Sequence, residues 1–484
     1  MTPNQYTPEE PISSIATALA PAALGIIRVS GKKCIELVAE VFSRPKALLE
    51  AAGNTLVYGW IVDKKNVCHG GQAKSSQKID EVMCAVYRGP KSFTGEDMVE
   101  IFCHGGPSVV TAIQNLMLKS GFRQANRGEY TFRAYINGKT DLTKAEAVKE
   151  IIDSHTDASR SHAVGRLSGS LFSEIDSIKK LIIDTLAAIE VEIEYPEDEE
   201  TIADTFDRKD IEDAISRLQS LVDSWKSEKL YQDGARVVLA GRTNAGKSSL
   251  FNAILKEERA IVSDIEGTTR DWLESWASIN GIPVRLFDTA GLRETEDVIE
   301  AQGVQLSKNL ASDADVVLYL VDSTAGLSDD DKEFIQKCRE PLILVYTKKD
   351  KGGESLPLTA ASTESSVTPS NGAHPRNAPV CQVSISSKTG EGLKDLFNET
   401  EKILTAGLTT EREQAGVGSE RQKNAVAEAL ECVKHALISA DDNYTLDAVV
   451  QDLEDSLDAL SEVTGDITPD DVLGSIFANF CVGK

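Results

Sequence analysis

Eight consecutive residues, Gly241 to Ser248, have the types and spacing of a phosphate-binding loop. They read Gly-Arg-Thr-Asn-Ala-Gly-Lys-Ser and stand between an apolar run and a stretch with helical periodicity, the context expected of a G-x-x-x-x-G-K-[ST] motif. Glycines let backbone N–H groups turn towards phosphate oxygens, and the N-terminus of the next helix adds its positive end. Lys247 is predicted to reach the β- and γ-phosphates of a nucleotide, and Ser248 to ligate Mg²⁺.

Four further motifs follow in the order and spacing found in GTPases. They are Gly267-Thr-Thr-Arg-Asp271, Asp288-Thr-Ala-Gly291, Thr347-Lys-Lys-Asp350 and Ser386-Ser-Lys388. Thr269 is predicted to close on Mg²⁺ and the γ-phosphate, and Asp288, at the end of an apolar run, to hold the Mg²⁺ shell. Asp350 is predicted to pair with two donors on the Watson–Crick edge of guanine. Adenine lacks that pair of donors, so the predicted nucleotide is GTP.

Two positions depart from the usual GTPase pattern. The base-recognition motif normally begins with Asn and here begins with Thr347; this change is expected to weaken guanine affinity, while Asp350 keeps the main discriminating contact. Leu292 follows the Asp-Thr-Ala-Gly motif, where Ras-like enzymes carry the Gln that positions the attacking water. Leucine cannot orient water, so either hydrolysis is very slow or another group does this work.

Two side chains are candidates for that work. The side-chain oxygen of Asn244, inside the phosphate-binding loop, can hold a monovalent cation against the phosphates, which would supply the charge that an arginine finger gives elsewhere. Glu300, in the predicted second switch segment 292–303, can orient water once that segment is ordered. The alternative for Glu300 is a solvated acid among neighbouring acidic residues, and the sequence alone slightly favours it.

The surrounding pattern predicts the elements that position these residues. Apolar runs at 236–240, 284–287, 314–321 and 341–346 alternate with helical stretches, which indicates a parallel sheet with crossover helices in the manner of Ras-like P-loop proteins. Around this α/β domain lie an α+β region and a helical region that the α/β domain interrupts. The predicted domains are 1–140 (α+β), 141–233 (helical, first part), 234–395 (Ras-like GTPase) and 396–484 (helical, second part).

Three shorter signals complete the predicted architecture. β-rich runs at 24–29, 82–86 and 98–102 belong to the α+β domain, and apolar residues at helical spacing from Leu171 to Leu186 indicate a long amphipathic helix. Residues 352–378 consist largely of Ser, Thr, Gly, Pro, Ala and Asn, which predicts a disordered insertion without chemistry.

The charge of the chain restricts its partners. The 484 residues include 51 Lys+Arg and 77 Asp+Glu, a net charge of −26, which excludes binding of nucleic acid by bulk charge. Residues 1–140 hold 16 basic and 12 acidic residues, a net of +4, whereas 441–471 hold eleven acidic residues and no Lys or Arg. An anionic partner is therefore expected at the N-terminal domain and not along 441–471.

Other compositional features point to the cytoplasm. Eight scattered cysteines without a C-x-x-C pair fit a reducing compartment, and no apolar run reaches the ~18 residues of a membrane span. The first residues have neither a secretory pattern nor an Arg-rich transit pattern. The expectation is a cytoplasmic protein with no membrane contact.

Over nearly its whole length the chain resembles the MnmE (TrmE) family of bacterial tRNA modification GTPases. The matching segments are Gly25–Gly31 (GIIRVSG), Ser92–Asp97 (SFTGED), Cys103–Pro107 (CHGGP), Arg127–Arg133 (RGEYTFR), Asn137–Leu142 (NGKTDL) and Phe480–Lys484 (FCVGK). The family's ending is usually Phe-Cys-Ile-Gly-Lys, so Val482 is a mild change. The 352–378 insertion and Thr347 are the clearest departures.

The resemblance implies a specific activity and set of partners. The family works with the flavoprotein MnmG (GidA), in a heterotetramer or larger complex, to add a carboxymethylaminomethyl-type group at carbon 5 of the wobble uridine in tRNA. The carbon comes from a one-carbon tetrahydrofolate, 5,10-methylene- or 5-formyl-tetrahydrofolate, bound by an N-terminal domain that also forms the homodimer. Hydrolysis of GTP in this family requires K⁺ and occurs when two GTPase domains meet.

The resemblance also implies site residues. Folate contacts fall on Arg28, Glu100, Lys139 and Lys484. K⁺ ligands fall on Asn244, Ser263, Ile265 and Thr268, and Mg²⁺ ligands on Ser248 and Thr269. The catalytic set is Lys247, the water-orienting Glu300, and Cys481. The GTP-binding set is Asn244, Ala245, Gly246, Lys247, Ser248, Ser249, Ser263, Asp264, Ile265, Glu266, Gly267, Thr268, Thr269, Asp288, Thr289, Ala290, Gly291, Thr347, Lys348, Lys349, Asp350, Ser386, Ser387 and Lys388.

Two residues keep two interpretations each. Cys481 is either a thiol with a catalytic or redox role in uridine modification or a small apolar residue that packs the last helix, and the sequence does not separate these interpretations. His104 stands in a His-Gly-Gly-Pro turn, and a structural use is favoured over metal binding because no other ligand lies at metal-site spacing.

Two other classes of GTPase are alternatives. A ribosome-assembly switch without one-carbon chemistry predicts an RNA-binding domain after the GTPase domain, but the region after Lys394 is acidic and helical and has no G-x-x-G. A membrane-remodelling GTPase would need a basic or apolar membrane-contact segment, and none is evident.

Overall fold

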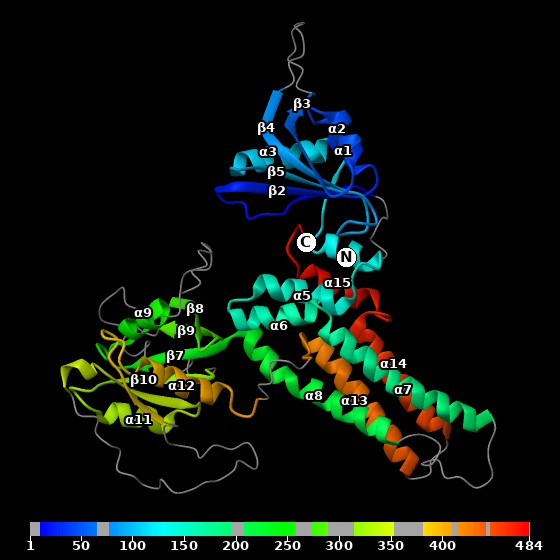
Figure 1. Cartoon of the computed structure of the whole chain (residues 1–484). Coiled ribbons are helices and arrows are strands. Elements are labelled where there is room, and N and C mark those ends of the chain that lie inside the picture. Colours follow the sequence, from blue (N-terminus) through cyan, green and yellow to red (C-terminus); the bar gives the residue numbers. More distant parts are fainter. Residues whose placement is uncertain are drawn as a thin grey trace. The chain divides into compact units, whose positions relative to one another are not determined.

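The computed structural model describes residues 10–64, 77–194, 208–257, 273–288, 314–352, 381–408, 415–441 and 446–483. The chain divides into two compact units. The first comprises Met1–Lys149, Leu167–Leu218 and Asn424–Lys484, and the second comprises Glu150–Arg166 and Gln219–Lys423. Each unit contains one six-stranded sheet and parts of the helical region, and the predicted combination of α+β, helical and Ras-like α/β parts is confirmed (Figure 1).

The sheet of the first unit has the strand order β3-β4-β5-β2-β1-β6. Its strands are β1 (Ile12–Ile15), β2 (Ala22–Ser30), β3 (Thr55–Asp63), β4 (Gln77–Tyr87), β5 (Met98–Gly105) and β6 (Arg123–Gln124). All neighbouring pairs are antiparallel except β1 and β6, which are parallel. The three β-rich runs predicted in this region are confirmed as β2, β4 and β5.

One face of this sheet carries the core of the domain. Helices α1 (Cys34–Glu40), α2 (Pro45–Leu49) and α3 (Pro107–Lys119) accompany the sheet, and all three contribute to the core. In α3 the buried Ile113 and Met117, one turn apart, pack with strand residues such as Ile27 and Ile101. Burying each such side chain contributes about 1.5–3 kcal/mol. The opposite face of β3 and β4 leaves large apolar side chains exposed, among them Leu56, Tyr58 and Met83.

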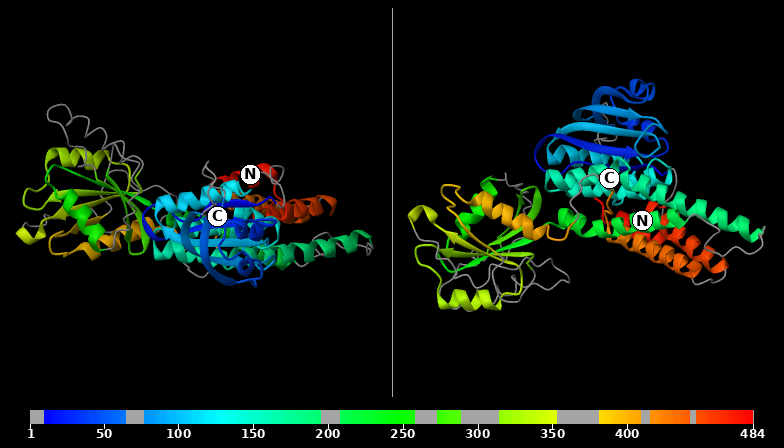
Figure 2. Two further views of the ribbon diagram at one scale, coloured as in Figure 1. Left: turned by 90° about the horizontal axis from the view of Figure 1, so that it is seen from above. Right: turned by 60° about the horizontal axis from the view of Figure 1, so that its bottom comes forward.

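Long helices follow the sheet in the first unit. They are α4 (Glu129–Ile136), α5 (Leu142–Asp153), α6 (Asp157–Leu167), α7 (Ser170–Glu194), α8 (Arg208–Asp233), α13 (Glu420–Asp441), α14 (Leu446–Thr464) and α15 (Asp470–Ala478), of which α5, α6, α8 and α13 have residues in both units. Helices α7 and α14 lie side by side (Figures 1 and 2). The helix predicted from Leu171 to Leu186 is confirmed as part of α7, whose Leu171, Ile175, Ile178 and Ile182 are buried.

The sheet of the second unit has the order β12-β11-β10-β7-β9-β8. Its strands are β7 (Ala235–Gly241), β8 (Leu273–Ile279), β9 (Ile282–Asp288), β10 (Val316–Asp322), β11 (Leu342–Thr347) and β12 (Cys381–Ser384). The predicted parallel strands are confirmed as β7, β9, β10 and β11. The apolar runs did not predict β12, which pairs in parallel with β11. The pattern did not predict β8, which joins β9 in an antiparallel hairpin at the edge.

Helices cover both faces of this second sheet. Helices α9 (Lys247–Glu257) and α12 (Leu393–Leu404) pack on one face with Val237 and Leu239 of β7, and α11 (Asp329–Lys337) packs on the other with Val238 and Ala240. Burial of both faces explains why β7 reads as a continuous apolar run. The α/β core includes Leu396, Phe397 and Leu404 of α12, so the domain boundary placed at residue 395 falls inside this helix.

No helix in the described part of the chain combines the length and apolarity needed to cross a membrane. Residues 353–378 of the predicted disordered insertion lie outside the described residues.

Candidate functional site

The phosphate-binding loop lies between β7 and α9. β7 ends at Gly241 and α9 begins at Lys247, so the loop stands at the carboxyl end of the strand, where open α/β sheets bind ligands. Asn244 turns the chain with a left-handed φ of 62°. The Lys247 ammonium donates to the carbonyls of Gly241 and Arg242 at 2.7 and 2.8 Å and is 8 % exposed. The cation is thus held over the loop that would receive phosphate.

Ser248, a predicted Mg²⁺ ligand, meets Asp288, which is predicted to hold the Mg²⁺ shell, beside this loop. The Ser248 hydroxyl donates to a carboxylate oxygen of Asp288 at 3.0 Å, and Asp288 is 4 % exposed. The register of β7 and β9, which pairs Leu239 with Asp288, brings the carboxylate to the start of α9. A hydroxyl and a carboxylate are hard oxygen ligands of the kind that Mg²⁺ binds together with phosphate oxygens, so this pair fits the ion.

The base-recognition motif is tied to the same loop. The Thr347 hydroxyl, at the end of β11, donates to the Ala245 carbonyl at 2.7 Å. The Ser386 hydroxyl donates to the Asp350 carboxylate at 2.8 Å, which orients it. Lys348 pairs with Asp322 at 2.5 Å, and this hydrogen bond lowers the pKa of Asp322 to about 2. Three separate strand ends therefore converge on one site.

The other predicted GTP-site residues divide into two groups. Ala245, Gly246 and Ser249 lie in the loop or in α9, Lys349 pairs with Glu391 at 2.7 Å, and Ser387 and Lys388 follow Ser386 after β12. The second group lies outside the described residues and consists of Ser263, Asp264, Ile265, Glu266, Gly267, Thr268, Thr269, Thr289, Ala290, Gly291 and Glu300. Lys484 of the predicted folate set also lies outside them. The placement of these residues stays a prediction.

A second cluster forms in the first unit around Arg28 and Glu100. These residues are register partners on β2 and β5. The Arg28 guanidinium donates to Oε1 of Glu100 through Nε at 2.8 Å, and a second guanidinium nitrogen lies 2.7 Å from the same oxygen. Tyr87 donates to the other Glu100 oxygen at 3.3 Å, and burial, followed by the charge of Glu100, raises the pKa of Tyr87. Both charged groups are mostly shielded from water.

The segment after α15 supplies a main-chain group to this cluster. Arg28 also donates to the carbonyl oxygen of Gly483 at 2.9 Å. Gly483 has a φ of 102°, and a Cβ there would lie 2.8 Å from the Ile15 carbonyl, so only glycine fits without strain. Val482 forms a β-bridge with Arg127. Cys481, between α15 and this bridge, is exposed.

A loop with an exposed aromatic ring borders the cluster. Phe93 is 41 % exposed, and its ring centroid lies 5.6 Å from Cζ of Arg28. Lys139 donates to the Pro90 carbonyl at 2.9 Å and Asn137 to the Thr94 carbonyl at 2.7 Å. These bonds fix the loop that presents the ring. The folate residues inferred from the sequence did not include Phe93, although it stands inside the matching SFTGED segment.

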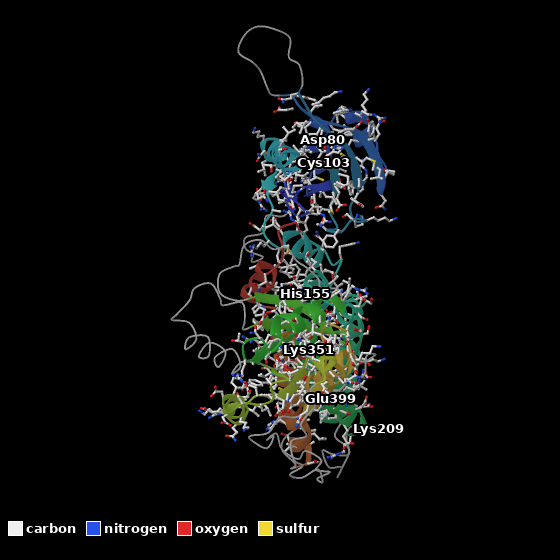
Figure 3. All side chains as sticks on the ribbon, turned by 90° about the vertical axis from the view of Figure 1, so that its left-hand side faces the viewer. Asp80, Cys103, His155, Lys209, Lys351 and Glu399 are labelled. Atoms are coloured by element: carbon white, nitrogen blue, oxygen red, sulfur yellow. The ribbon has the colours of Figure 1, made fainter. Side chains whose placement is uncertain are left out.

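His104 and Cys103 have structural roles in this unit. The His104 main-chain N–H and ring nitrogen both bond Asp80 at 2.8 Å, which ties the end of β5 to β4. Asp80 and Cys103 are labelled in Figure 3. Burial and the charge of Asp80 raise the pKa of Cys103 to about 11. Across the described segments, no group of three or more His, Cys, Asp and Glu side chains has the arrangement of a metal site.

Comparisons with known proteins cover the chain almost from end to end. The family described as "GTP-binding protein TrmE N-terminus" matches residues 11–139, and the family described as "MnmE helical domain" matches residues 142–481. The chain is 48 % identical to the tRNA modification GTPase MnmE of Treponema denticola over 99 % of each chain. It is 41 % identical to the tRNA modification GTPase MnmE of Treponema pallidum over the whole of each chain.

Among solved structures, Aquifex aeolicus Era bound to GDP and AlF4⁻ is 27 % identical with a TM-score of 0.27. That match covers 41 % of this chain and 66 % of the other.

Proposed function

Since the chain belongs to the MnmE family of tRNA modification GTPases, we propose that its P-loop site hydrolyses GTP and that hydrolysis accompanies modification of carbon 5 of the wobble uridine in tRNA. The observation that carries the proposal is the convergence of Lys247, Ser248, Asp288 and Asp350 at neighbouring strand ends. A cation, an Mg²⁺-binding pair and a guanine-reading carboxylate are the parts that binding of GTP requires.

Each of these side chains has a defined task in the proposed reaction. Lys247, now bonded to the Gly241 and Arg242 carbonyls, exchanges those partners for phosphate oxygens and neutralises charge that develops on them. Ser248 and Asp288 would hold Mg²⁺, whose charge would offset that of the phosphates. Asp350, oriented by Ser386, pairs with the guanine donors.

The proposal includes a requirement for K⁺. Asn244 is exposed and sits in the left-handed conformation at the turn of the loop, so its side-chain oxygen is accessible to a monovalent cation. The cation would supply the positive charge near the phosphates that an arginine finger gives elsewhere. Leu292 cannot position water as a glutamine does, so that task is assigned to Glu300. Ser263, Ile265, Thr268 and the water-orienting Glu300 complete this proposal from the family resemblance, and the two GTPase domains of a dimer would meet during hydrolysis.

The Arg28 cluster is the proposed binding site for the one-carbon tetrahydrofolate that supplies the added carbon. Glu100 can accept hydrogen bonds from the amino and N–H edge of the pterin ring, and Arg28 and Lys139 can bind its carbonyl or carboxylate groups. The exposed Phe93 ring offers an apolar surface to a flat ligand beside Arg28. Lys484 belongs to the same proposal, and Cys481 is a candidate whose step is not assigned.

The N-terminal sheet is the proposed dimer surface. Leu56, Tyr58 and Met83 are 60 %, 50 % and 46 % exposed, and Tyr58 and Met83 are register partners on β3 and β4. Water-exposed apolar side chains gathered on one face favour burial by another protein surface. The flavoprotein MnmG is the proposed second partner, and tRNA is expected near the N-terminal domain of net charge +4 and on MnmG.

Calorimetry on the full chain tests the function directly. We expect 5-formyl-tetrahydrofolate and GTP to bind independently, and GTP turnover to accompany modification when MnmG and tRNA are present. Binding of GTP without any binding of the folate would remove the one-carbon proposal and favour a GTPase switch of the ribosome-assembly type. Crosslinks of tRNA mainly to residues 441–471 would contradict the proposed tRNA surface.

A further inference from the structure

The side chain of Thr347 is already engaged by two main-chain carbonyls. Its hydroxyl lies 2.7 Å from the Ala245 oxygen and 3.3 Å from the Val321 oxygen. A carbonyl oxygen accepts hydrogen bonds and cannot donate them, so the hydroxyl must donate to one of the two. A threonine hydroxyl has a single hydrogen. That hydrogen is therefore used inside the protein.

The surroundings of Thr347 show what this bond does. Thr347 is 2 % exposed and ends β11, whereas Ala245 stands in the phosphate-binding loop. A Cβ added to Gly246 would lie 3.5 Å from the Thr347 hydroxyl, so the side chain packs closely against the main chain of this loop. The bond fixes the position of the base-recognition motif relative to the loop that binds phosphate.

The chemistry of guanine shows which atoms of the base receive no hydrogen bond from Thr347. The Watson–Crick edge of guanine carries the N1–H and N2–H donors beside the acceptor O6, and the adjoining Hoogsteen edge carries the acceptor N7. The Asp350 carboxylate, held by Ser386, can accept from the donors but cannot donate to N7. An asparagine at position 347 would have two amide hydrogens and an oxygen, enough to keep a bond to the loop and also donate to the base. Threonine has no second hydrogen.

We propose that Thr347 is a positioning residue that ties the base-recognition motif to the phosphate-binding loop and gives no hydrogen bond to the base, so that this protein accepts guanine nucleotides altered at N7. The inference rests on the proposed binding of GTP and deepens it by naming the edge of the base that the site reads. Recognition is concentrated on the Watson–Crick edge through Asp350.

Two triphosphates that differ at one ring atom test the proposal. In 7-deaza-GTP a C–H group replaces N7, and the Watson–Crick edge is unchanged. We expect the full-length wild-type protein to bind GTP and 7-deaza-GTP with affinities within about twofold, measured by displacement of a fluorescent GDP. The T347N variant should prefer GTP by about 3–10-fold, the net worth of one hydrogen bond. A wild-type preference for GTP of about fivefold or more would overturn the inference.

Two further variants distinguish the bond between Thr347 and the phosphate-binding loop from direct recognition of the base. T347V keeps the shape of threonine without the hydroxyl, and it should weaken GTP and 7-deaza-GTP equally, by about tenfold, because the loops lose their connection. T347S keeps the hydroxyl and should bind GTP and 7-deaza-GTP with affinities close to those of the wild type. If T347V bound both nucleotides as tightly as wild type, the proposed connection between the base-recognition motif and the phosphate-binding loop would be wrong. If T347V lost affinity for GTP alone, Thr347 would contact N7, and the inference would also be wrong.

The outcome also distinguishes this inference from the proposed function. If wild-type protein bound no guanine nucleotide, the proposed function would fail and the inference with it. If GTP bound normally but 7-deaza-GTP did not, the inference alone would fail. The comparison of the two nucleotides on wild-type protein needs no variant, so it stands even if T347V does not fold.

Discussion

The imidazole of His155 lies face to face with the indole of Trp276, with ring centroids 3.8 Å apart and planes inclined by 20°. His155, labelled in Figure 3, stands between α5 and α6, and Trp276 lies on β8. A Cβ on Gly281, in the β8–β9 turn, would lie 3.9 Å from the Ala158 methyl of α6. The β8–β9 hairpin, whose strands lie between the first and second switch motifs, thus rests on the α5–α6 corner within one compact unit.

Acidification should weaken this contact. Burial lowers the pKa of His155 below its ordinary value, and the charge of Asp153 offsets this only in part. The unfolded chain then binds the proton more readily than the folded one, so the stability that neutral His155 contributes is present above about pH 6.5 and is lost as the pH falls below it. We expect the free energy of unfolding to fall more steeply from pH 7 to 5.5 in wild type than in His155→Phe, which keeps the stack without the proton. Equal slopes in chemical denaturation would contradict the assignment.

A buried ion cluster should control the stability of the second unit. The Arg166 side chain is 3 % exposed and pairs with Glu150 at 2.5 Å and with Glu228 at 2.7 Å. Arg166→Met would remove the guanidinium from two shielded carboxylates, of which Glu228 keeps its contact with His162 at 2.9 Å, and we expect a loss of about 3–5 kcal/mol in denaturant unfolding. Arg160→Met, on the same helix, removes an exposed pair with Asp157 and should cost at most about 1 kcal/mol. Equal effects of the two variants would show that the cluster is not a stability determinant.

The same cluster leaves no room for a side chain at residue 418. A Cβ on Gly418 would overlap the Glu150 carboxylate and lie 2.7 Å from Nε of Arg166. Gln232 donates to the Gly418 carbonyl at 2.7 Å, and the Gly418 N–H donates to Gln422 at 2.7 Å. The segment that enters α13 is therefore held against the end of α8 by the bond from Gln232 to its main chain, and it packs against the buried ion cluster with no room for a side chain at residue 418.

Arg28 should be required for binding of the folate but not for binding of the guanine nucleotide. Arg28→Gln removes the ion pair with Glu100 and the bond to Gly483, and we expect affinity for 5-formyl-tetrahydrofolate to fall by about tenfold or more. Affinity for GDP should stay at the wild-type value, since the two sites belong to different units. Lys119→Gln, an exposed residue at the end of α3, serves as the charge-matched control. Calorimetry that showed undiminished folate binding in Arg28→Gln would reject the site.

The identity of the monovalent cation should set the rate of GTP hydrolysis. We expect turnover in K⁺ to exceed turnover in Na⁺ by about tenfold or more, because a fitted cation near the phosphates stabilises charge in the transition state. Asn244→Ala should remove most of that difference and leave binding of GDP in place. Phosphate release measured in K⁺ and in Na⁺ at equal ionic strength tests whether Asn244 holds the cation. Equal rates in K⁺ and Na⁺ for the wild type would exclude the role of Asn244.

The nucleotide site could be predicted from the sequence to a large extent, because its residues are local to strand ends. The apolar runs identified β7, β9, β10 and β11, and parallel strands bring their carboxyl ends to one edge. The approach of Ser248 to Asp288 follows from that geometry. Strand β8 escaped prediction because its apolar and polar residues, LESWASI, follow a GTPase motif without a long apolar run.

Other features had no usable signal in one sequence. Glu150, Arg166 and Glu228 are ordinary charged residues of amphipathic helices until folding brings them together. The exposure of Phe93 depends on a loop fixed by distant side chains, and the Gly483 carbonyl is a main-chain group that every residue possesses. Contacts of this kind depend on tertiary structure, which residue types and periodicity do not encode locally.

The bond between Arg28 and Gly483 joins residues 455 positions apart. During synthesis from the N-terminus at roughly 5–20 residues per second, about 20–90 s separate the two. The strands β2 and β5 can pair, and Arg28 can meet Glu100, within the first part of that interval. The cluster receives its main-chain oxygen only after both sheets and the long helices have left the ribosome. Its assembly is therefore a late event in the biogenesis of the chain, although its first residue is among the earliest made.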